Sequence, residues 1–138
     1  MKDYILHQAM LKEVEAGNVS ASSIGDLTIF KYSQDCHIEG RWNSVNRQAR
    51  GIIFRDDGTI VARPFAKFFN LGEISETELS NLPQEDFEVF EKVDGSCGIG
   101  YLNDKGTWWL ATPGSMASPQ AIDGTIMLHD KTSYALEH

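Results

Sequence analysis

β-branched and aromatic residues gather in short runs along the first half of the chain, which is typical of strands. The runs are 26–32 (DLTIFKY), 51–55 (GIIFR) and 59–65 (TIVARPF). The last two are separated by Asp-Asp-Gly at 56–58, and Asp-Gly favours a tight reversal between antiparallel strands. We therefore predict one strand over 26–32 and a hairpin over 51–65.

A helical period is present near the start of the chain. Within 3–16, Leu11 and Val14 fall near one face, and Gly17 follows as a C-cap signal. This pattern predicts an amphipathic helix. Residues 33–49 are polar and have no clear period, so we predict a loop there.

Helix and strand signals both occur in the second half of the chain. Ser-Glu-Thr-Glu at 75–78 has the form of a capping box that opens a short helix, which Pro83 ends. Another helix is expected from Ser118, because Pro119 behind it suits the first helical position. Together these elements predict an α+β fold with mostly antiparallel sheets and flanking helices. The strands predicted in this half are 87–93, 97–102 and 107–112.

Charge is distributed unevenly along the chain. The formal net charge is −8 at pH 7, which argues mildly against nucleic-acid binding. Yet all five arginines fall within 41–63, whereas 71–94 carries eight acids and only Lys92 as a cation. One stretch is thus suited to meet anions while the other repels them. The simpler interpretation is an uneven solvated surface.

Several classes of protein are disfavoured by the composition. No apolar stretch approaches the ~20 residues that span a bilayer, and the N-terminus is too mixed for a signal peptide. Cys36 and Cys97 lack Cys-x-x-Cys spacing, so neither zinc nor a disulfide framework is indicated. The histidines show no metal-ligand spacing, and we assign no metal ligands. We expect a cytoplasmic location, with a viral gene as one source.

Lys92 lies inside one of the predicted strands. Alternation puts it on the same side as Phe90 and Asp94, so this side of the strand mixes apolar and charged residues. Such patterning is poor for a core strand and tolerable where a strand opens into a site. A lysine amine is nucleophilic only when unprotonated, and burial or nearby cations favour that state. The alternative is a solvent-exposed lysine before an Asp-Gly turn.

An uncharged Lys92 beside positive side chains would suit nucleotidyl transfer. Its amine would attack the α-phosphate of a nucleoside triphosphate, form a phosphoramidate and release pyrophosphate. The charge on that phosphate must be neutralised in the transition state, which arginine, lysine and Mg²⁺ can do. Lys67 and the arginine-rich hairpin are candidates for this positive charge.

Five stretches of the chain carry a resemblance to a known family. They are IFKYS at 29–33, ARGIIF at 49–54, RPFAKFFNLGE at 63–73, EKVDGS at 91–96 and TPGSMASPQA at 112–121. In this order and at similar spacings, they resemble the RNA ligases of the bacteriophage T4 RNA ligase 1 type. A joint match over nearly the whole chain is far more specific than one short motif.

The resemblance implies a partial nucleotidyltransferase fold, the adenylation domain shared with DNA ligases and mRNA-capping enzymes. It implies that Lys92 is the adenylated lysine and that Tyr32, Arg50 and Lys67 contact the nucleotide. ATP and Mg²⁺ would be the cofactors, and the partners would be RNA ends with a 5′-phosphate and a 3′-hydroxyl. The side chains suit these roles, because arginine offers a fork, lysine a point charge and tyrosine an aromatic face.

Each of these residues also has a structural interpretation. Arg50 could cap a strand end or pair with Asp56 or Asp57. Lys67 could be a surface lysine beside a buried Phe68-Phe69 pair, and Tyr32 could be a core aromatic. We expect four aromatic residues to pack in the core rather than stack on bases: Phe68, Phe69, Trp108 and Trp109.

Some features of the family are missing. After its lysine strand the family carries an acidic residue beside the nucleotide, a Glu-Gly strand and a Lys-x-Lys strand. Downstream of Lys92 the only lysines are Lys105 and Lys131, and Glu39-Gly40 comes too early. The last three residues, 136–138 (LEH), look like a vector junction with a tag. We therefore expect 1–135 to be the N-terminal portion of an adenylation domain.

The leading hypothesis is thus an ATP-dependent RNA ligase fragment. An alternative within enzymes is another covalent nucleotidyltransferase such as a DNA ligase. An alternative of another class is a non-catalytic nucleotide- or RNA-binding module. The natural RNA substrate and the oligomeric state are left open by the sequence.

Overall fold

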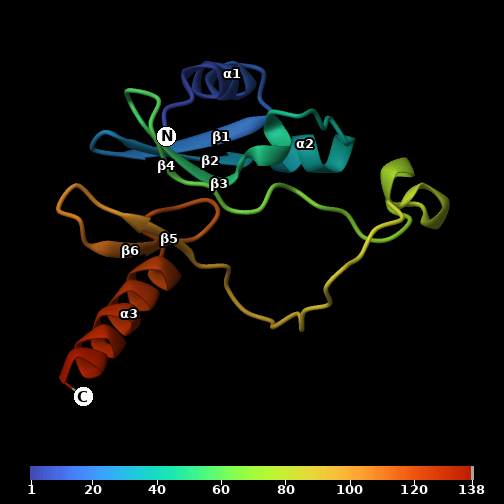
Figure 1. The fold of residues 1–138 in the computed structure, drawn as a ribbon. Helices are drawn as coiled ribbons and strands as arrows, with labels where there is room; N and C mark the ends of the chain where they lie inside the picture. Colours follow the sequence, from blue (N-terminus) through green and yellow to red (C-terminus); the bar gives the residue numbers. More distant parts are fainter. Residues whose placement is uncertain (138) are drawn as a thin grey trace.

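The computed structural model describes the backbone of residues 1–137 and the side chains of residues 1–131. It shows an α+β arrangement of antiparallel sheets with flanking helices, as predicted (Figure 1). The helices are α1 (Tyr4–Glu15), α2 (Gln34–Glu39) and α3 (Pro119–Glu137). The strands are β1 (Val19–Ile24), β2 (Leu27–Tyr32), β3 (Arg50–Arg55), β4 (Ile60–Ala62), β5 (Ile99–Leu102) and β6 (Trp108–Ala111). Short 3₁₀ turns are η1 (Asn46–Gln48), η2 (Ser75–Thr77) and η3 (Leu79–Asn81).

A four-stranded antiparallel sheet in the order β1-β2-β3-β4 forms the centre of the molecule. Helix α1 covers one face of this sheet, and the separate β5–β6 hairpin lies against the other (Figure 1). Helix α3 packs on the hairpin, chiefly against β6. Between β4 and β5 a long segment extends away from the two sheets and then returns to them (Figure 1). Among the described residues, no helix combines the length and apolar character that crossing a membrane requires.

Strands β2 and β3 are buried on both faces, which explains the continuous apolar run in the sequence. Successive side chains of a strand point to opposite faces, so Ile53 packs toward the β5–β6 hairpin while Ile52 and Phe54 pack toward α1. Phe30 of β2 meets Phe54 edge to face, with 5.9 Å between ring centroids. His7 of α1 stacks on Phe54 at 4.9 Å. The sheet therefore separates two apolar cores.

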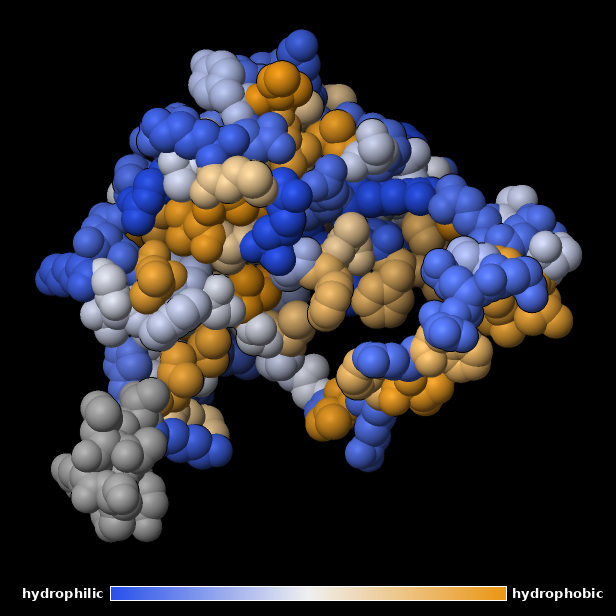
Figure 2. Space-filling view, viewed as in Figure 1, coloured by the Kyte–Doolittle hydropathy of each residue, from blue (hydrophilic) through white to orange (hydrophobic). Residues whose placement is uncertain are grey.

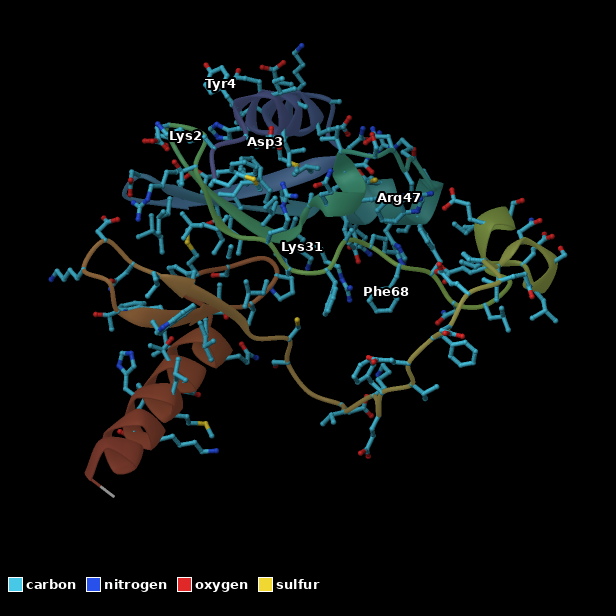
Figure 3. All side chains as sticks on the ribbon, in the orientation of Figure 1. Lys2, Asp3, Tyr4, Lys31, Arg47 and Phe68 are labelled. Atoms are coloured by element: carbon cyan, nitrogen blue, oxygen red, sulfur yellow. The ribbon has the colours of Figure 1, made fainter. Side chains whose placement is uncertain are left out.

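The N-terminal residues hold α1 against the β3–β4 turn (Figure 3). Asp3 is the N-cap of α1 and accepts a hydrogen bond from the Leu6 N–H at 2.9 Å. Its own N–H donates to the Gly58 carbonyl at 2.9 Å, and Lys2 pairs with Asp57 at 2.9 Å. Hydrogen bonds from Thr59 and from the Lys2 ammonium hold the pKa of Asp57 well below its usual range.

The prediction of a loop over 33–49 is wrong in part, because this stretch contains α2 and η1. The signals were present: Ser33 caps α2 by accepting from the Cys36 N–H at 3.1 Å, and Gly40 ends it in the left-handed conformation. Strand β1 was not predicted either. Its sequence, VSASSI, exposes every residue except Val19, so the pairing with β2 rather than an apolar pattern makes it a strand.

Two predictions between residues 75 and 93 are also wrong. The capping box at 75–78 opens no α-helix, and only the turns η2 and η3 form there. The strand predicted at 87–93 is absent, and Phe87 and Val89 are each 84% exposed. A strand needs a partner for its backbone groups, and no described strand pairs with this segment. Its alternation has no apolar surface to pack against.

The later elements agree with the sequence. Strands β5 and β6 lie within the predicted ranges, and α3 begins at Pro119. The Ser118 hydroxyl accepts from the Ala121 N–H at 3.2 Å, as an N-cap does. Gly124 does not end the helix; a Cβ there would lie 3.0 Å from Leu110 Cδ1, so its small size permits close packing on β6. Of the expected tag residues 136–138, His138 and the side chains lie outside the described residues.

The central sheet and the β5–β6 hairpin come into close contact at Gly51. The β2–β3 register shifts between Phe30 and Lys31, so Gly51 is the extra residue of a bulge, with a φ of 100°. A Cβ on Gly51 would collide with the side chain of Ile99 in β5 and lie 3.0 Å from Pro113 Cα. Only glycine combines this φ with this contact.

We predict that Gly51→Ala lowers the free energy of unfolding by about 3 kcal/mol, from backbone strain and the collision with Ile99 and Pro113. Urea unfolding followed by circular dichroism measures the change. Gly25→Ala is the matched control, since Gly25 has a φ of 59° with nothing within 4 Å of its Cβ position. It should cost only about 1 kcal/mol. Equal losses in both variants would contradict the proposed sheet contact.

Candidate functional site

Two strand ends bring separate sequence stretches together at one edge of the central sheet. Lys31, near the end of β2, is paired in register with Arg50, the first residue of β3. The next residue, Tyr32, donates its N–H to the Ala49 carbonyl at 2.6 Å. Gly114 approaches the same place, because a Cβ there would lie 3.2 Å from Lys31 Cδ. The stretches 29–33, 49–54 and 112–121 therefore meet.

The RPFAKFFNLGE stretch joins them through an aromatic cluster, which we define as Tyr32, Trp42, Lys67 and Phe69. The Trp42 ring meets Tyr32 at 4.9 Å and Phe69 at 5.7 Å, each at 80°. This is the edge-to-face geometry that aromatic pairs favour. Lys67 Nζ lies 4.4 Å from the centre of the Phe69 ring, and the Lys67 N–H donates to the Arg47 carbonyl at 2.7 Å. Lys67 Nζ also lies 5.8 Å from the centre of the Trp42 ring, so the cluster holds this cation beside two rings.

Arg50 is held beside this cluster by an aromatic ring rather than by a carboxylate. Its guanidinium lies 4.6 Å from the centre of the Phe68 ring. The alternative pairing with Asp56 or Asp57 is not formed, and Asp57 pairs with Lys2 instead. Phe68 is 64% exposed, so the expectation that it packs in the core is wrong. The planar charge of Arg50 remains partly accessible.

The positively charged side chains differ in whether they form ion pairs with carboxylates of the same chain. Four of the five arginines pair with the chain's own carboxylates: Arg41 with Glu39, Arg47 with Glu76, Arg55 with Asp26 and Asp104, and Arg63 with Asp3. In the part of the chain that the structure describes, Lys31, Arg50 and Lys67 form no such pair. The same is true of Lys12, Lys105 and Lys131, but Lys31, Arg50 and Lys67 are the unpaired cations that lie at this edge of the sheet. Figure 3 shows Lys31, Arg47 and Phe68 near this end of the sheet.

The other three aromatic residues expected in the core, Phe69, Trp108 and Trp109, are partly buried or exposed. Phe69 packs within the aromatic cluster and is partly buried. Trp108 is 55% exposed and Trp109 is 40% exposed, both on β6. The core of the molecule therefore relies on other residues, chiefly those of β2, β3 and α1.

A half-buried carboxylate positions the loop that carries Trp42 and Arg47. Glu13 of α1 accepts hydrogen bonds from the side-chain amides of Asn18 at 2.8 Å, Asn43 at 2.8 Å and Asn46 at 3.1 Å. Asn46 is fully buried and also donates to the Arg41 carbonyl at 2.8 Å. Burial raises the pKa of Glu13, but the three amide hydrogen bonds outweigh it, and the net pKa lies below its ordinary value.

A cleft of about 580 Å³ opens between the end of β4 and the start of β5. One wall is formed by 62–66 and the other by 97–100, with Gln48 at one side. Arg63 brings a charge to this cleft, although its guanidinium lies 3.8 Å from the Asp3 carboxylate. The cleft has the size of a small-molecule pocket, which typically measures about 300–1,000 Å³.

Lys92 is not brought to these residues. Its side chain is 86% exposed and pairs with Asp94 at 2.9 Å. The segment around it stands away from the body, with apolar side chains in solvent (Figure 2). The sequence-based expectation of a partly buried lysine among cations is therefore not met in this arrangement. Tyr32, Arg50 and Lys67 come together as expected, and Lys92 does not.

Three residues of the site were missed by sequence reasoning. Lys31 lies inside the quoted IFKYS stretch but was treated only as part of a strand. Trp42 and Glu13 carry no motif, and their roles depend on contacts across the fold. A signal existed for the loop, since Asn43 and Asn46 are residues that bond the backbone locally, as Asn43 does to the Asn46 N–H at 2.8 Å.

The described residues offer no metal centre of their own. No group of three or more histidine, cysteine, aspartate or glutamate side chains among them could hold a metal ion.

Comparison with known proteins finds one family and several relatives. The profile of an RNA ligase family, that of the phage T4 RNA ligase 1 type, matches residues 48–135. A protein of Thermovibrio ammonificans, named only provisionally as an RNA ligase, is 35% identical over 120 residues. The RNA ligase of Rhodothermus phage RM378 is 28% identical over 150 aligned residues, and RNA ligase 1 of bacteriophage TS2126 is 38% identical over 84.

The chain is shorter than these relatives. The matches cover 86%, 91% and 53% of this chain, in the same order, but only 31%, 33% and 20% of the three relatives. The chain therefore spans a third of their length or less.

We predict that Glu13→Gln lowers the free energy of unfolding by about 1–2 kcal/mol at pH 7, because a neutral amide replaces a carboxylate that accepts three hydrogen bonds. The depressed pKa of Glu13 means that its contribution is present above the ordinary carboxyl pKa and is lost as the pH falls through the folded-state value. Urea unfolding at pH 7 and at pH 3 tests this. A difference between wild type and variant that does not shrink at pH 3 would contradict it.

Proposed function

Because the chain belongs to the RNA ligase family of the phage T4 RNA ligase 1 type, we propose that it forms the N-terminal part of an ATP-dependent RNA ligase adenylation domain. One structural observation carries the proposal furthest. Lys31 and Arg50 lie next to the aromatic cluster that contains Lys67, and none of the three cations forms an ion pair with a described carboxylate. Such a surface suits a ligand with both phosphates and a base.

Tyr32, Arg50 and Lys67 are proposed to contact ATP. Arg50, already oriented by Phe68, would offer its fork to phosphate oxygens, and Lys67 would supply a point charge. Tyr32 would present a partly buried ring and a hydroxyl. Mg²⁺ is proposed to enter with the triphosphate and to balance its charge. We assign it no ligand in this chain.

Lys92 is proposed as the nucleophile. Its Nζ would attack the α-phosphorus of ATP, so that a P–N bond forms, the P–O bond to pyrophosphate breaks and the amine loses a proton. An RNA 5′-phosphate oxygen would then displace the lysine and take the adenylate. Finally an RNA 3′-hydroxyl would displace AMP and join the ends. Arg50 and Lys67 would offset the negative charge that develops on phosphate oxygens in the first step.

The position of Lys92 in this structure is compatible with that role only if its segment moves. Lys92 lies seven residues before Ile99, which contacts the Gly51 position next to Arg50. Seven residues can span at most about 23 Å, so Lys92 always stays within that distance of Ile99. A change in this segment can therefore bring Lys92 back toward Lys31, Arg50 and Lys67. Gly95, with a φ of 146°, supplies a pivot between them. The pair with Asp94 would have to break.

The exposure of Lys92 favours a second candidate function. A chain that binds nucleotide or RNA without turnover needs Arg50 and Lys67 but no buried lysine. This non-catalytic module is the alternative that the observed arrangement of residues 1–131 supports. A different covalent nucleotidyltransferase, such as a DNA ligase, has no observation in its favour here.

We predict that the full-length product of the gene takes up label from α-labelled ATP and that Lys92→Ala abolishes it. The labelled adduct should be stable to alkali and labile to acid, as a phosphoramidate is. Lys105→Ala is the control, because Lys105 lies in the β5–β6 turn outside the site. ATP binding without label in the wild-type protein would instead favour the non-catalytic module.

We also predict that Arg50→Ala raises the dissociation constant for ATP by about tenfold or more, because a charge-assisted pair of hydrogen bonds is lost. Isothermal titration with this chain measures it. Arg41→Ala is the matched control, since Arg41 is neutralised by Glu39 and should change the constant less than twofold. Similar effects of the two substitutions would show that general charge, rather than the Arg50 site, attracts the ligand.

A further inference from the structure

A second concave surface lies beside α2, next to Lys31 of the candidate site. This groove measures about 540 Å³. It shares Lys31 and Tyr32 with the candidate site, so the two surfaces are continuous. The residues that line it are Ser20, Lys31, Tyr32, Ser33, Gln34 and His37.

Aromatic rings form one side of this groove. The rings of Tyr32 and His37 lie 6.1 Å apart at 35°, and both line the groove. Trp42 supports them from behind, at 4.9 Å from Tyr32 and 6.0 Å from His37. His37 belongs to the exposed face of α2, so its imidazole is reachable from solvent. Rings held in place by a third ring offer a preorganised stacking surface.

Some polar groups of the groove form hydrogen bonds within the chain, and others are available to a ligand. The Ser33 hydroxyl donates to the Gly17 carbonyl at 2.8 Å, and the Ser20 hydroxyl donates to the Lys31 carbonyl at 3.2 Å. These two hydroxyls stabilise the fold. The Lys31 ammonium and the Gln34 amide have no hydrogen-bond partner among the described residues. They are free to meet a phosphate and a base edge.

We propose that this groove is a subsite for single-stranded RNA, in which one base stacks on Tyr32 and His37 while Lys31 contacts a neighbouring phosphate. The inference rests on the proposed function, because it places an RNA strand beside the nucleotide site of a ligase. A base in a duplex cannot expose its face, so the groove selects single strands. The groove offers few hydrogen-bond donors and acceptors, so binding depends on base stacking rather than on the base sequence.

Charge limits where the strand can run. Asp35 and Glu39 lie on α2 beside the groove, and Glu39 is neutralised by Arg41 at 3.1 Å. Asp35 has no described ion pair and would repel a phosphate. The strand is therefore expected to leave the groove toward Lys31 and Arg50, where the positive charges lie.

The test uses Trp42 as a reporter. Trp108→Phe and Trp109→Phe leave Trp42 as the single tryptophan of the chain, in contact with both stacking rings. A ten-nucleotide oligouridylate, added without ATP, should change the Trp42 fluorescence saturably. His37→Ala in this background should raise the dissociation constant about tenfold, within the range measured for loss of one base–aromatic stack. A duplex of the same length should bind more weakly.

Two further variants keep the inference open to refutation. Ile38→Ala, on the same helix and 70% exposed but outside the groove, should leave the constant unchanged, and circular dichroism checks that α2 is intact. Lys31→Gln should reduce the slope of log affinity against log salt by about 0.7, the value for one phosphate contact on a single strand. Equal affinities of the His37 and Ile38 variants, or equal binding of duplex, would overturn the subsite.

Failure of this subsite and failure of the proposed function give different results. Lys92→Ala should lose the adenylate label yet bind the oligonucleotide as the parent does, because Lys92 lies outside the groove. Absence of label together with binding that depends on His37 would refute the nucleophile and keep the subsite. Adenylate label together with oligonucleotide binding that does not change in His37→Ala would keep the nucleophile and refute the subsite.

Discussion

The close contact between the central sheet and the β5–β6 hairpin at Gly51 is the constraint on which the rest of the structure depends. The bulge at this residue shifts the register of β3, so that Arg50 lies opposite Lys31 rather than one residue further along. The missing side chain lets Ile99 and Pro113 approach. This glycine therefore permits the close contact between the two sheets and also sets the register position of Arg50.

Charge within the site arises from pairing rather than from composition. The chain is acidic overall, and most of its arginines are neutralised by aspartates and glutamates from distant parts of the sequence. Lys31, Arg50 and Lys67 form no such pair: Arg50 and Lys67 lie against aromatic rings, and Lys31 lies against Gly114. A local positive surface on an acidic protein is thus compatible with anionic ligands, and like charges elsewhere discourage unspecific contacts.

The segment from 83 to 98 is exposed to solvent along its whole length. Its apolar residues are exposed, and its acids face solvent. No described strand pairs with this stretch, so its alternating side chains stay unburied. Lys92 lies in it, so the role proposed for Lys92 requires contacts that the described residues do not make in this structure.

The sequence by itself determined many of the secondary-structure elements. Local rules predicted α1, β2, the β3–β4 hairpin and the start of α3, because capping residues and turn glycines act within a few positions. The choice of Arg50, Lys67 and Tyr32 as candidate site residues rested instead on resemblance to a family, and their roles stay a prediction. The strand at 87–93 was predicted wrongly, since alternation specifies a strand only where a partner exists. Only the tertiary structure decided which arginines are neutralised, that Trp42 completes the aromatic cluster and that Lys92 stands apart. These outcomes depend on distances between residues far apart in sequence, as between Glu13 and Asn43, and no local pattern encodes such distances.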